Sequence, residues 1–514
     1  MIKSNSSIPQ KDYFSTEHLK AGLKTRALRG ASLTVIGQLA SFIIETTGTI
    51  ILARLLTPHD FGLVTMVVSL SLLLQSFGAN GFVEAVVQSK QIDHKQISTL
   101  FWINAGLSFM LMLFFMASAP IIVWFYKEPL LKPITVVMAV SILFGGLSNQ
   151  HMSLLTRNMH FMKITSTEFV ARLISISTAV ALAWWGWEYW ALVAKWVLSP
   201  LIITVGVWII CGWRPGPPAR GTGVRPMLKF AFHTYGNFIM SYFRRNIDKM
   251  LVGRSFGTQE LGYYDRAYHL SNMVPVQILS PLNSVSVATF SRLSDEPEKY
   301  RRHYLTVLSI LAFVGMPASA VLTINSHDII FLLLGPRWDQ TGQIFSIFGL
   351  SIGVAIIYIT HGWLHLSLGT PDRWFKWSII EFIVTMLCIT IGLKYGAMGI
   401  AAAFTVSFYI LLGPALWYAG KTVKLEISSV LSTVWKYFAS ALVAGLLSWF
   451  FLYSFGLSSD IFLSLETPWR IAISSTICIL IYLILLVSAF GSLRPLSQFI
   501  SIIRETIQSK QSAA

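Results

Sequence analysis

Apolar segments of helical length alternate with short polar breaks along almost the whole chain. Most of these segments have about 20 residues or more, the length with which an α-helix crosses about 30 Å of hydrocarbon. Backbone groups in lipid must be satisfied within the chain, and continuously apolar runs of this length are typical of helices rather than of barrel strands. The pattern predicts about fourteen transmembrane helices, over residues 31–53, 62–84, 98–125, 133–155, 166–186, 189–211, 228–253, 262–290, 304–325, 341–367, 374–394, 397–420, 431–455 and 469–490.

One polar break differs from the others because it is rich in proline and glycine. It reads WRPGPPARGTGVRP, from Trp213 to Pro226, and follows the sixth predicted helix. A linker at this point predicts an all-α polytopic membrane protein with two six-helix lobes and two further helices at the C-terminus. The predicted parts are a cytoplasmic N-terminal segment 1–30, an N-lobe 31–212, a cytoplasmic linker 213–227, a C-lobe 228–420, helices thirteen and fourteen in 421–492, and a cytoplasmic tail 493–514.

A short motif occurs twice, at the first hairpin of each predicted lobe. LARLLTPHDFGLV at Leu52 and LVGRSFGTQELGYY at Leu251 share an arginine, five residues, an acid, an apolar residue and a glycine, at a shift of about 200 residues. Because each lobe has an even number of helices, the lobes keep the same orientation and form a parallel repeat. The glycines permit a turn and close packing, and the arginines can bind helix-end carbonyls or the nearby acids, so we interpret the motif as scaffold. Its residues are Arg54, Asp60, Gly62, Arg254, Glu260 and Gly262.

The composition agrees with a membrane protein. Hydrophobic residues make up 54% of the chain and charged residues 12%, whereas soluble domains have about 25% charged residues. The clusters of lysine and arginine fall on one side of the membrane if every helix crosses once, which predicts that both termini are cytoplasmic. The net charge of +16 therefore reflects topology and does not indicate a nucleic-acid partner. Cys211, Cys388 and Cys478 lie in or at the end of apolar runs, so neither a disulfide, a metal site nor a cofactor is predicted.

Three segments resemble a known family. They are RRNIDKMLVGRSFGTQELGYYDRAYHLSNMVPVQILSPLNSVSVATFSRLSDEPEKYRRHY from Arg244, ARLLTPHDFGLVTM at the first hairpin, and LLLGPRWDQTGQIFSIFGL at Leu332. They are similar to the polysaccharide transporter family of the multidrug/oligosaccharidyl-lipid/polysaccharide (MOP) exporter superfamily, and within it to Wzx-type flippases of the colanic-acid exporter kind. The resemblance runs over about residues 25–420.

This resemblance implies a MATE-like pair of six-helix lobes that work by alternating access. The implied function is the transfer of undecaprenyl-diphosphate-linked oligosaccharide repeat units across the bacterial inner membrane. Such units serve the biosynthesis of a surface polysaccharide such as exopolysaccharide, lipopolysaccharide O-antigen or capsule. By resemblance to lipid II flippases of the same superfamily, helices thirteen and fourteen would border a groove for the lipid tail. The implied partners are this lipid-linked oligosaccharide, the bilayer and other polysaccharide assembly proteins.

Two other functions are alternatives. A MATE-like exporter of small cationic compounds shares the fold, but arginine and lysine along the path would repel such compounds. An integral-membrane polysaccharide polymerase or ligase would need catalytic groups on a large outer loop. The predicted outer connections are short and carry neither paired acids nor a nucleophile with a base, so the protein is not predicted to be an enzyme.

Ionisable residues inside predicted spans need a partner or a wet cavity, since each costs at least about 2.5–3.5 kcal/mol at the centre of a membrane helix. In helix seven a polar stripe can form a cationic wall for diphosphate or acidic sugars, or Arg244 can instead pair with Asp248 at i, i+4. Arg172 follows Glu168 by four residues, so a local pair is the simpler account there. Lys195 has no acid at i−3 or i+4 in its own helix and is the better cavity candidate. The predicted substrate-binding residues are Arg172, Lys195, Asn237, Arg244 and Arg245.

A second group of residues is predicted to couple or gate transport: Glu45, Asp248, His361, His365 and Glu381. Glu45 can pair across the lobes in one state and be released in the other, as a gate or a proton-coupling carboxylate, or it can simply contact a neighbouring helix. His361 and His365 lie one helical turn apart without an evident third ligand, which argues against zinc. They suit a proton relay or the lining of a wet portal. Glu381 can also sit at the headgroup level.

Overall fold

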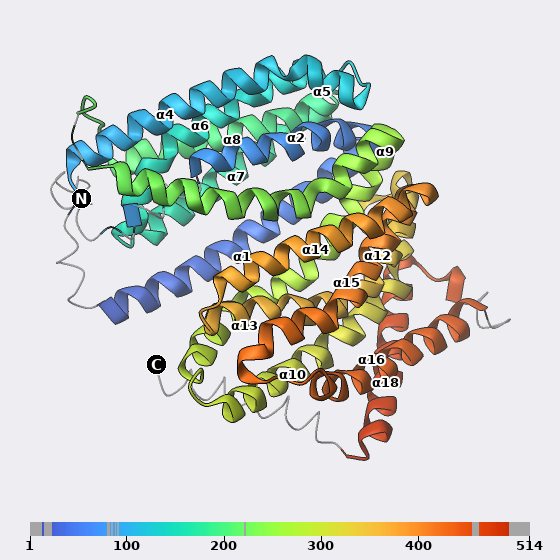
Figure 1. The fold of residues 1–514 in the computed structure, drawn as a ribbon. Helices are drawn as coiled ribbons and strands as arrows, with labels where there is room; N and C mark the ends of the chain where they lie inside the picture. The colour runs from blue at the N-terminus through green and yellow to red at the C-terminus, as the bar shows by residue number, and fades with distance from the viewer. Residues whose placement is uncertain are drawn as a thin grey trace, which may run out of the picture. The chain divides into compact units, whose positions relative to one another are not determined.

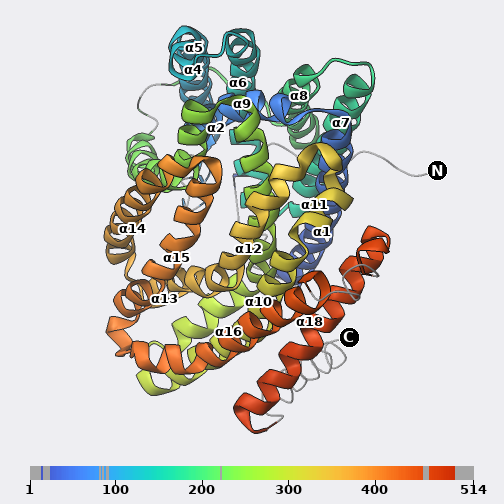
Figure 2. The same ribbon diagram turned by 90° about the vertical axis from the view of Figure 1, so that its right-hand side faces the viewer.

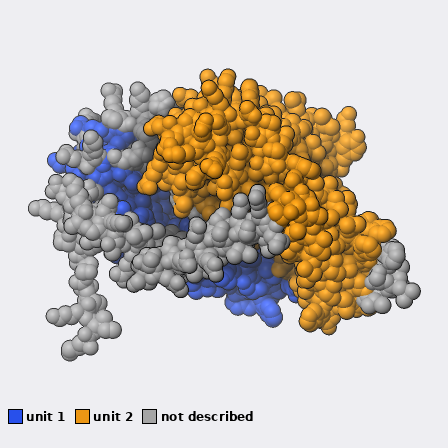
Figure 3. All heavy atoms as spheres, turned by 90° about the horizontal axis from the view of Figure 1, so that it is seen from below, with its two compact units in different colours: residues 1–262 blue, residues 263–514 orange. Residues whose placement is uncertain are grey.

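The structure of the protein is a computed structural model that describes residues 13–14, 23–79, 83, 86–87, 89, 92–219, 221, 223–454 and 462–492. Regular secondary structure in these residues is helical. The chain forms two compact units, residues 1–262 and residues 263–514, which Figure 3 colours blue and orange. The predicted all-α fold class is therefore confirmed.

Unit 1 is built around a long central helix, α6 (Leu131–Arg157), which packs against α2, α4 and α8. Figure 1 shows α4, α6 and α8 side by side. A further layer is formed by α7, which packs against both α1 and α8. The other helices of the unit are α1 (Leu23–Leu55), α2 (Pro58–Ala79), α4 (His94–Ala117), α5 (Ala119–Tyr126), α7 (Phe161–Trp184), α8 (Tyr189–Cys211) and the first part of α9 (Arg225–Arg292).

Unit 2 contains the rest of α9 and is organised around α10 (Pro297–Ile324), which packs against α12 and α16. Figure 2 shows α14 and α15 side by side, and α16 packs against the last helix, α18. The elements are α11 (Ser326–Leu334), η3 (Pro336–Trp338), α12 (Asp339–Ile359), α13 (His361–Ser367), α14 (Pro371–Gly392), η4 (Leu393–Tyr395), α15 (Gly396–Gly420), η5 (Lys421–Val423), α16 (Ile427–Trp449), η6 (Phe450–Ser454) and α18 (Thr467–Phe490).

The described helices follow the predicted hydrophobic pattern closely. In the described residues, 10 helical stretches are long and apolar enough to cross a membrane, and one of them, Pro371–Val423, includes both α14 and α15. The predicted spans 98–125 and 341–367 are each divided between two helices, α4 with α5 and α12 with α13. The protein is a multi-pass membrane protein. The boundary predicted between the lobes, at residues 213–227, stays a prediction.

The first copy of the repeated motif forms a helix start. Thr57 N donates to Asp60 Oδ2 at 2.9 Å, and Asp60 N donates to Thr57 Oγ1 at 3.3 Å. This reciprocal pair is a capping box. Thr57 directly precedes Pro58, the first residue of α2, and Asp60 is the third residue of the helix. The acid of the motif therefore caps the N-terminus of α2.

The second copy turns at a glycine. Gly257, the counterpart of Thr57, has φ 86° and ψ −174° and interrupts α9 between the predicted spans 228–253 and 262–290. This backbone region favours glycine because a Cβ atom would clash there. The two copies thus break the helical path at the same motif position by different means.

The two copies also contact each other within unit 1, at the glycine that both copies share. A Cβ atom on Gly62 would lie 1.7 Å from the carbonyl oxygen of Thr258, and one on Gly262 would lie 1.9 Å from the carbonyl oxygen of Pro58. Thr258 and Pro58 occupy equivalent motif positions, so the two contacts are related by approximate two-fold symmetry. Glycine is required at both positions because a main-chain carbonyl oxygen occupies the place of a Cβ atom.

Replacing Gly262 with alanine should destabilise the protein, because the added methyl group meets a main-chain oxygen that cannot rotate away. Overpacking of this kind costs about 1–3 kcal/mol, so we expect a lower Tm of the purified protein in detergent. Gly145→Ala in α6 is the matched control, since a Cβ atom there meets no atom within 4 Å. Equal melting temperatures for the two variants would contradict the steric account.

Candidate functional site

The charges predicted in helices one and six meet in the structure. Lys195 Nζ on α8 donates to Glu45 Oε1 on α1 at 2.6 Å, with side-chain exposures of 17% and 34%. Each charge thereby gains the partner that an apolar surrounding demands. Sequence alone did not connect them, because they are 150 residues apart. The observed contact lies inside unit 1, and the pairing of Glu45 across the lobes stays a hypothesis.

Arg172 lies on α7, which packs against both α1 and α8, the helices that carry Glu45 and Lys195. Its side chain is half-buried, as is that of Glu168. The two form no ion pair within 4.0 Å in the described structure, although their spacing predicts one. Arg172 still acts on the Glu168 carboxyl through its charge, and its role in substrate binding stays a prediction.

An apolar groove of about 710 Å³ runs between α1 and α7. Small residues shape it: a Cβ atom on Gly48 would lie 2.3 Å from Cγ2 of Ile176. Its lining includes Ile43, Thr47, Ile51, Leu173, Val180 and Trp184. Trp184 and Trp185 at its end are 77% and 73% exposed, as tryptophans of an interfacial belt would be.

The cationic stripe predicted on helix seven falls in α9. The side chains of Asn237, Arg244 and Arg245 lie outside the described part of the structure. Asp248 on the same helix is completely buried. The cationic wall and the Arg244–Asp248 pair both stay predictions.

In unit 2, His361 and His365 lie in one buried corner. His361 is 6% exposed and His365 is 0% exposed, and their ring centroids are 6.1 Å apart at an angle of 86°. His361 Nδ1 lies 2.6 Å from the carbonyl oxygen of Tyr358, and His365 Nδ1 lies 3.1 Å from Thr370 Oγ1. The predicted wet portal is not what surrounds them, because both side chains are packed in the protein. Glu381 on α14 is also buried, at 5% exposure, rather than at an exposed headgroup level.

Two tyrosine hydroxyls join this corner to α10. Tyr300 Oη lies 2.6 Å from Ser367 Oγ, and Tyr304 Oη lies 2.7 Å from Thr360 Oγ1. Both tyrosines are buried in the core of unit 2. The short helix α13 is thus held at both ends by hydrogen bonds from a neighbouring long helix.

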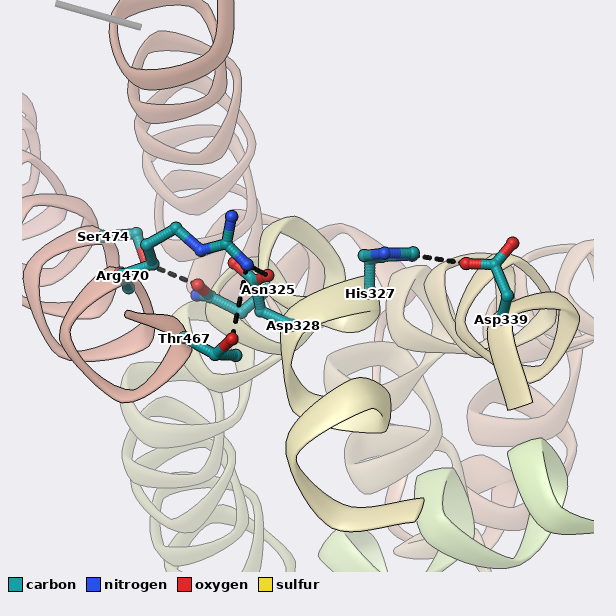
Figure 4. Close-up of polar contacts among 7 residues, drawn as sticks. All are labelled: Asn325, His327, Asp328, Asp339, Thr467, Arg470 and Ser474. Carbon is teal, nitrogen blue, oxygen red and sulfur yellow. Dashed lines mark hydrogen bonds and ion pairs between the residues drawn. The ribbon is translucent and has the colours of Figure 1, made fainter. Parts of the chain in front are cut away.

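A polar cluster at the junction of α10, α11 and α18 was not predicted (Figure 4). Arg470 donates through Nη2 to Asp328 Oδ1 at 2.6 Å and to Thr467 Oγ1 at 3.4 Å. Ser474 donates to Asn325, and His327 faces Asp339 at 3.0 Å. These contacts fix α18 to the corner between α10 and α11. No sequence signal joins Arg470 to Asp328, since they are 142 residues apart and near the ends of their apolar segments.

A second apolar groove, of about 490 Å³, opens beside this cluster. Its lining comes from α10, α11, α12, α15 and α16, and its described lining includes no residue of α18. Polar groups gather toward one end, where Thr323, Ser326 and His327 contribute, and the remainder is mostly apolar. The apolar lining includes Met316, Ala320, Leu350, Leu442, Leu446 and Trp449.

The remaining motif residues lie at helix ends. Arg54 and Arg254 are exposed, and the Arg254 guanidinium carbon lies 5.8 Å from the centroid of the Phe125 ring. Such a contact is a cation–π interaction. Glu260 is half-buried. Among the described residues, no group of three or more His, Cys, Asp or Glu side chains is placed to hold a metal ion.

Several proteins with related sequences are named for polysaccharide synthesis or transport. The chain is 23% identical over 414 residues to the lipopolysaccharide biosynthesis protein WzxC of Escherichia coli (strain K12), covering 77% of this chain and 82% of the relative. It is 23% identical over 467 residues to the teichuronic acid biosynthesis protein TuaB of Bacillus subtilis (strain 168), covering 90% and 95%. It is 21% identical over 370 residues to the succinoglycan biosynthesis transport protein ExoT of Rhizobium meliloti (strain 1021), covering 72% and 75%.

Two solved structures share the fold. The lipid II flippase MurJ in an inward closed conformation matches with a TM-score of 0.71 and 19% identity, over 89% of this chain and 99% of that chain. A multidrug resistance MATE family transporter of the MOP superfamily, inward-facing, matches with a TM-score of 0.60 and 10% identity, over 76% and 96%. These likenesses confirm the MATE-like fold that the sequence resemblance implies. The family model described as "Polysaccharide biosynthesis protein" matches residues 51–343, more than half of the 514 residues, and the chain therefore belongs to that family.

Proposed function

We propose that this protein is a flippase that moves undecaprenyl-diphosphate-linked oligosaccharide repeat units across the bacterial inner membrane by alternating access. The units serve the biosynthesis of a surface polysaccharide, and no covalent chemistry is involved. The observation that carries the proposal is that a member of a polysaccharide biosynthesis family has a lipid flippase fold over 89% of its length. A substrate of this kind is an anion with a polar head and a long apolar tail, and the described residues offer features for each part.

The diphosphate and acidic sugars require cations inside the spans. We propose Arg172, Lys195, Asn237, Arg244 and Arg245 for this role, because guanidinium and ammonium groups form charge-assisted hydrogen bonds to phosphate oxygens. Lys195 is already bound to Glu45 at 2.6 Å. A phosphate oxygen can take the place of that carboxylate, so arrival of the substrate would release Glu45.

This exchange gives Glu45 a role as a gate or a proton-coupling carboxylate. A carboxylate released from its lysine in an apolar surrounding must find another partner or take up a proton. Either outcome differs between the substrate-free and substrate-bound states, which is what coupling requires. Asp248, His361, His365 and Glu381 are the other groups that we propose for coupling or gating.

The lipid tail requires apolar surface that is continuous with the bilayer. The groove of about 490 Å³ in unit 2 meets this need, since its lining is mostly apolar and includes exposed leucines of α16. We propose that it holds part of the polyprenyl chain. The sequence resemblance implied helices thirteen and fourteen for this groove. Helix thirteen corresponds to α16, which lines the groove together with α10, α11, α12 and α15, whereas helix fourteen corresponds to α18, which is not in the described lining.

We also propose the topology and the setting. Both termini lie in the cytoplasm, the two lobes are residues 31–212 and 228–420, and residues 213–227 form a cytoplasmic linker, as the distribution of Lys and Arg supports. The motif residues Arg54, Asp60, Gly62, Arg254, Glu260 and Gly262 act as scaffold. Other polysaccharide assembly proteins are proposed partners.

Leaflet-resolved measurement of lipid-linked oligosaccharide tests the function directly. Cells that lack the protein should accumulate these units in the cytoplasmic leaflet, and the intact protein should relieve the accumulation. Arg244→Ala should lower the rescue about tenfold or more, since a charge-assisted hydrogen bond contributes about 1.5–3 kcal/mol.

Arg337→Ala serves as the matched control, because Arg337 is exposed on η3 and has no proposed contact with the substrate. Its rescue should equal that of the intact protein. Unpolymerised units at the outer leaflet of cells lacking the protein would overturn the flippase proposal and favour a later assembly enzyme.

A double-mutant cycle separates structure from transport at the α1–α8 ion pair. Glu45→Gln and Lys195→Met should each lower the Tm, because each leaves one charge without its partner, and the double variant should recover stability. We expect a coupling free energy of about 0.5–3 kcal/mol. Transport should stay low in all three variants; recovery of transport in the double variant would mean that the pair is structural only.

The groove of about 490 Å³ that we propose for the lipid tail can be blocked after the protein has folded. In a Cys388→Ala background, Leu446→Cys labelled with a bulky maleimide should lose transport, because the label fills the groove that Leu446 lines. Leu431→Cys on the same helix is the matched control, since Leu431 is 52% exposed and lies outside the groove lining. Equal transport by the two labelled proteins would refute a tail in this groove.

A further inference from the structure

His365 on α13 has one ring nitrogen that is buried without a hydrogen bond. Its side chain is 0% exposed, and its Nε2 atom has no hydrogen-bond partner. A buried polar atom in that state costs free energy, so native structures rarely leave one without a reason. The groups that surround His365 account for the state of its Nε2 atom.

The turn after α13 places the Thr370 hydroxyl beside both the Nδ1 atom and the carbonyl oxygen of His365. Gly369 has φ 63°, and Thr370 N donates to the carbonyl oxygen of His365 at 2.9 Å, which is the ending that a glycine permits after a helix. This ending brings Thr370 Oγ1 within 3.4 Å of the same carbonyl and 3.1 Å of His365 Nδ1. We assign the hydroxyl proton to this carbonyl, which makes the hydroxyl oxygen the acceptor of Nδ1–H. Nε2 is then left with a lone pair that can bind a proton.

The walls around His365 are aromatic and cationic. Its ring stacks parallel to that of Trp374 on α14, with centroids 6.2 Å apart at 8°, and lies 6.2 Å from the ring of Tyr418 on α15. The Arg373 guanidinium carbon lies 4.7 Å from the centroid of the same tyrosine ring. Arg373 also donates to Tyr418 O at 2.5 Å, which fixes the cation in this corner.

The other titratable groups of the corner come from each packed helix. His361 on α13 holds its own proton on Nδ1, because its partner there is a carbonyl oxygen, which can only accept. Tyr358 on α12 and Glu381 on α14 are buried, as are Tyr300 and Tyr304 on α10. Lys376 and Asp372 on α14 are exposed. Among these groups, Arg373 acts on His365 with a positive charge.

We propose that Nε2 of His365 is a proton-binding site, and that proton binding separates α13 from α14 and α15. The proton comes from water and joins the Nε2 lone pair, which converts the neutral imidazole into an imidazolium with one added positive charge. On release the proton returns to water. No other bond changes.

The packed arrangement opposes this charge, because the imidazolium would be buried beside a guanidinium without a water shell. A proton therefore binds better to an arrangement in which α13 has moved away from the walls, and proton binding shifts the population toward it. The hydrogen bonds from Tyr300 to Ser367 and from Tyr304 to Thr360 would transmit such a movement to α10. Its role in transport rests on the proposed flippase function, since it would supply a proton dependence to the alternation of states.

Fluorescence of Trp374 tests the site without any substrate. An imidazolium stacked on an indole ring quenches its emission, and separation of the rings also changes it. We expect the purified full chain in nanodiscs to show a reversible fluorescence change between about pH 8 and pH 4, the range over which histidine charges. The part due to this site is the difference between the intact protein and Trp374→Phe.

That difference should be lost in His365→Gln, which keeps a polar side chain and cannot titrate. Thr370→Val should shift the midpoint of the titration, because it removes the acceptor that holds the proton on Nδ1. His327→Gln is the matched control, since His327 is exposed and pairs with Asp339 outside this corner; its titration should match that of the intact protein. An unchanged titration in both His365→Gln and Thr370→Val would overturn the proposal.

Transport at several pH values then distinguishes this proposal from the function on which it rests. His365→Gln should lose the dependence of transport on pH while membrane abundance is unchanged. If the fluorescence titration depends on His365 but no lipid-linked units move, the flippase function fails and the proton site stands. If units move and the titration ignores His365, the proton site fails alone.

Discussion

The helix arrangement of unit 1 depends on a close contact between the main chains of α2 and α9. Gly62 and Gly262 each lie against a carbonyl oxygen of the opposite copy of the repeated motif, at distances that leave no room for a Cβ atom. The ends of α1 and α2 and the break in α9 at Gly257 all meet at this contact. Because the contact is reciprocal, any side chain at either glycine would push both copies apart. The repeat in the sequence is therefore a repeat of a steric requirement.

Charges inside the apolar helices follow a second constraint, that each must find a partner. Among the described residues, such pairs include Glu45 with Lys195 in unit 1, and Asp328 with Arg470 and Asp265 with Arg266 in unit 2. Asp328 and Arg470 sit in a network with Asn325, Thr467 and Ser474 (Figure 4), which suits a fixed clip for α18. The side chains of Glu45 and Lys195 are 34% and 17% exposed. We propose that an incoming anion can compete with Glu45 for the lysine. The same chemistry thus attaches a helix in unit 2, and we propose that it permits exchange of partners in unit 1.

Local backbone geometry prepares the buried histidine corner. The glycine-ended turn after α13 places the Thr370 hydroxyl beside both the carbonyl oxygen and the Nδ1 atom of His365. Packing then closes the other side with aromatic rings and leaves Nε2 without a partner. We propose that this packing ties the charge of His365 to the position of the short helix α13.

Elements that depend on local composition and on the period of apolar residues can be predicted from the sequence. Continuous apolar runs indicated the helices, the shared Arg–acid–Gly pattern indicated the repeat, and buried charges such as Glu45 and Lys195 marked positions that need partners. Only the tertiary structure decided which partners they have. Asp328 pairs with Arg470 across 142 residues, His361 and His365 are buried among packed side chains, and Arg172 forms no ion pair within 4.0 Å with Glu168. The physical reason is that hydrophobicity and helix geometry act over one or two turns and can be read along the chain. The choice of an ion-pair or stacking partner depends on helix packing, which joins residues that no sequence interval connects.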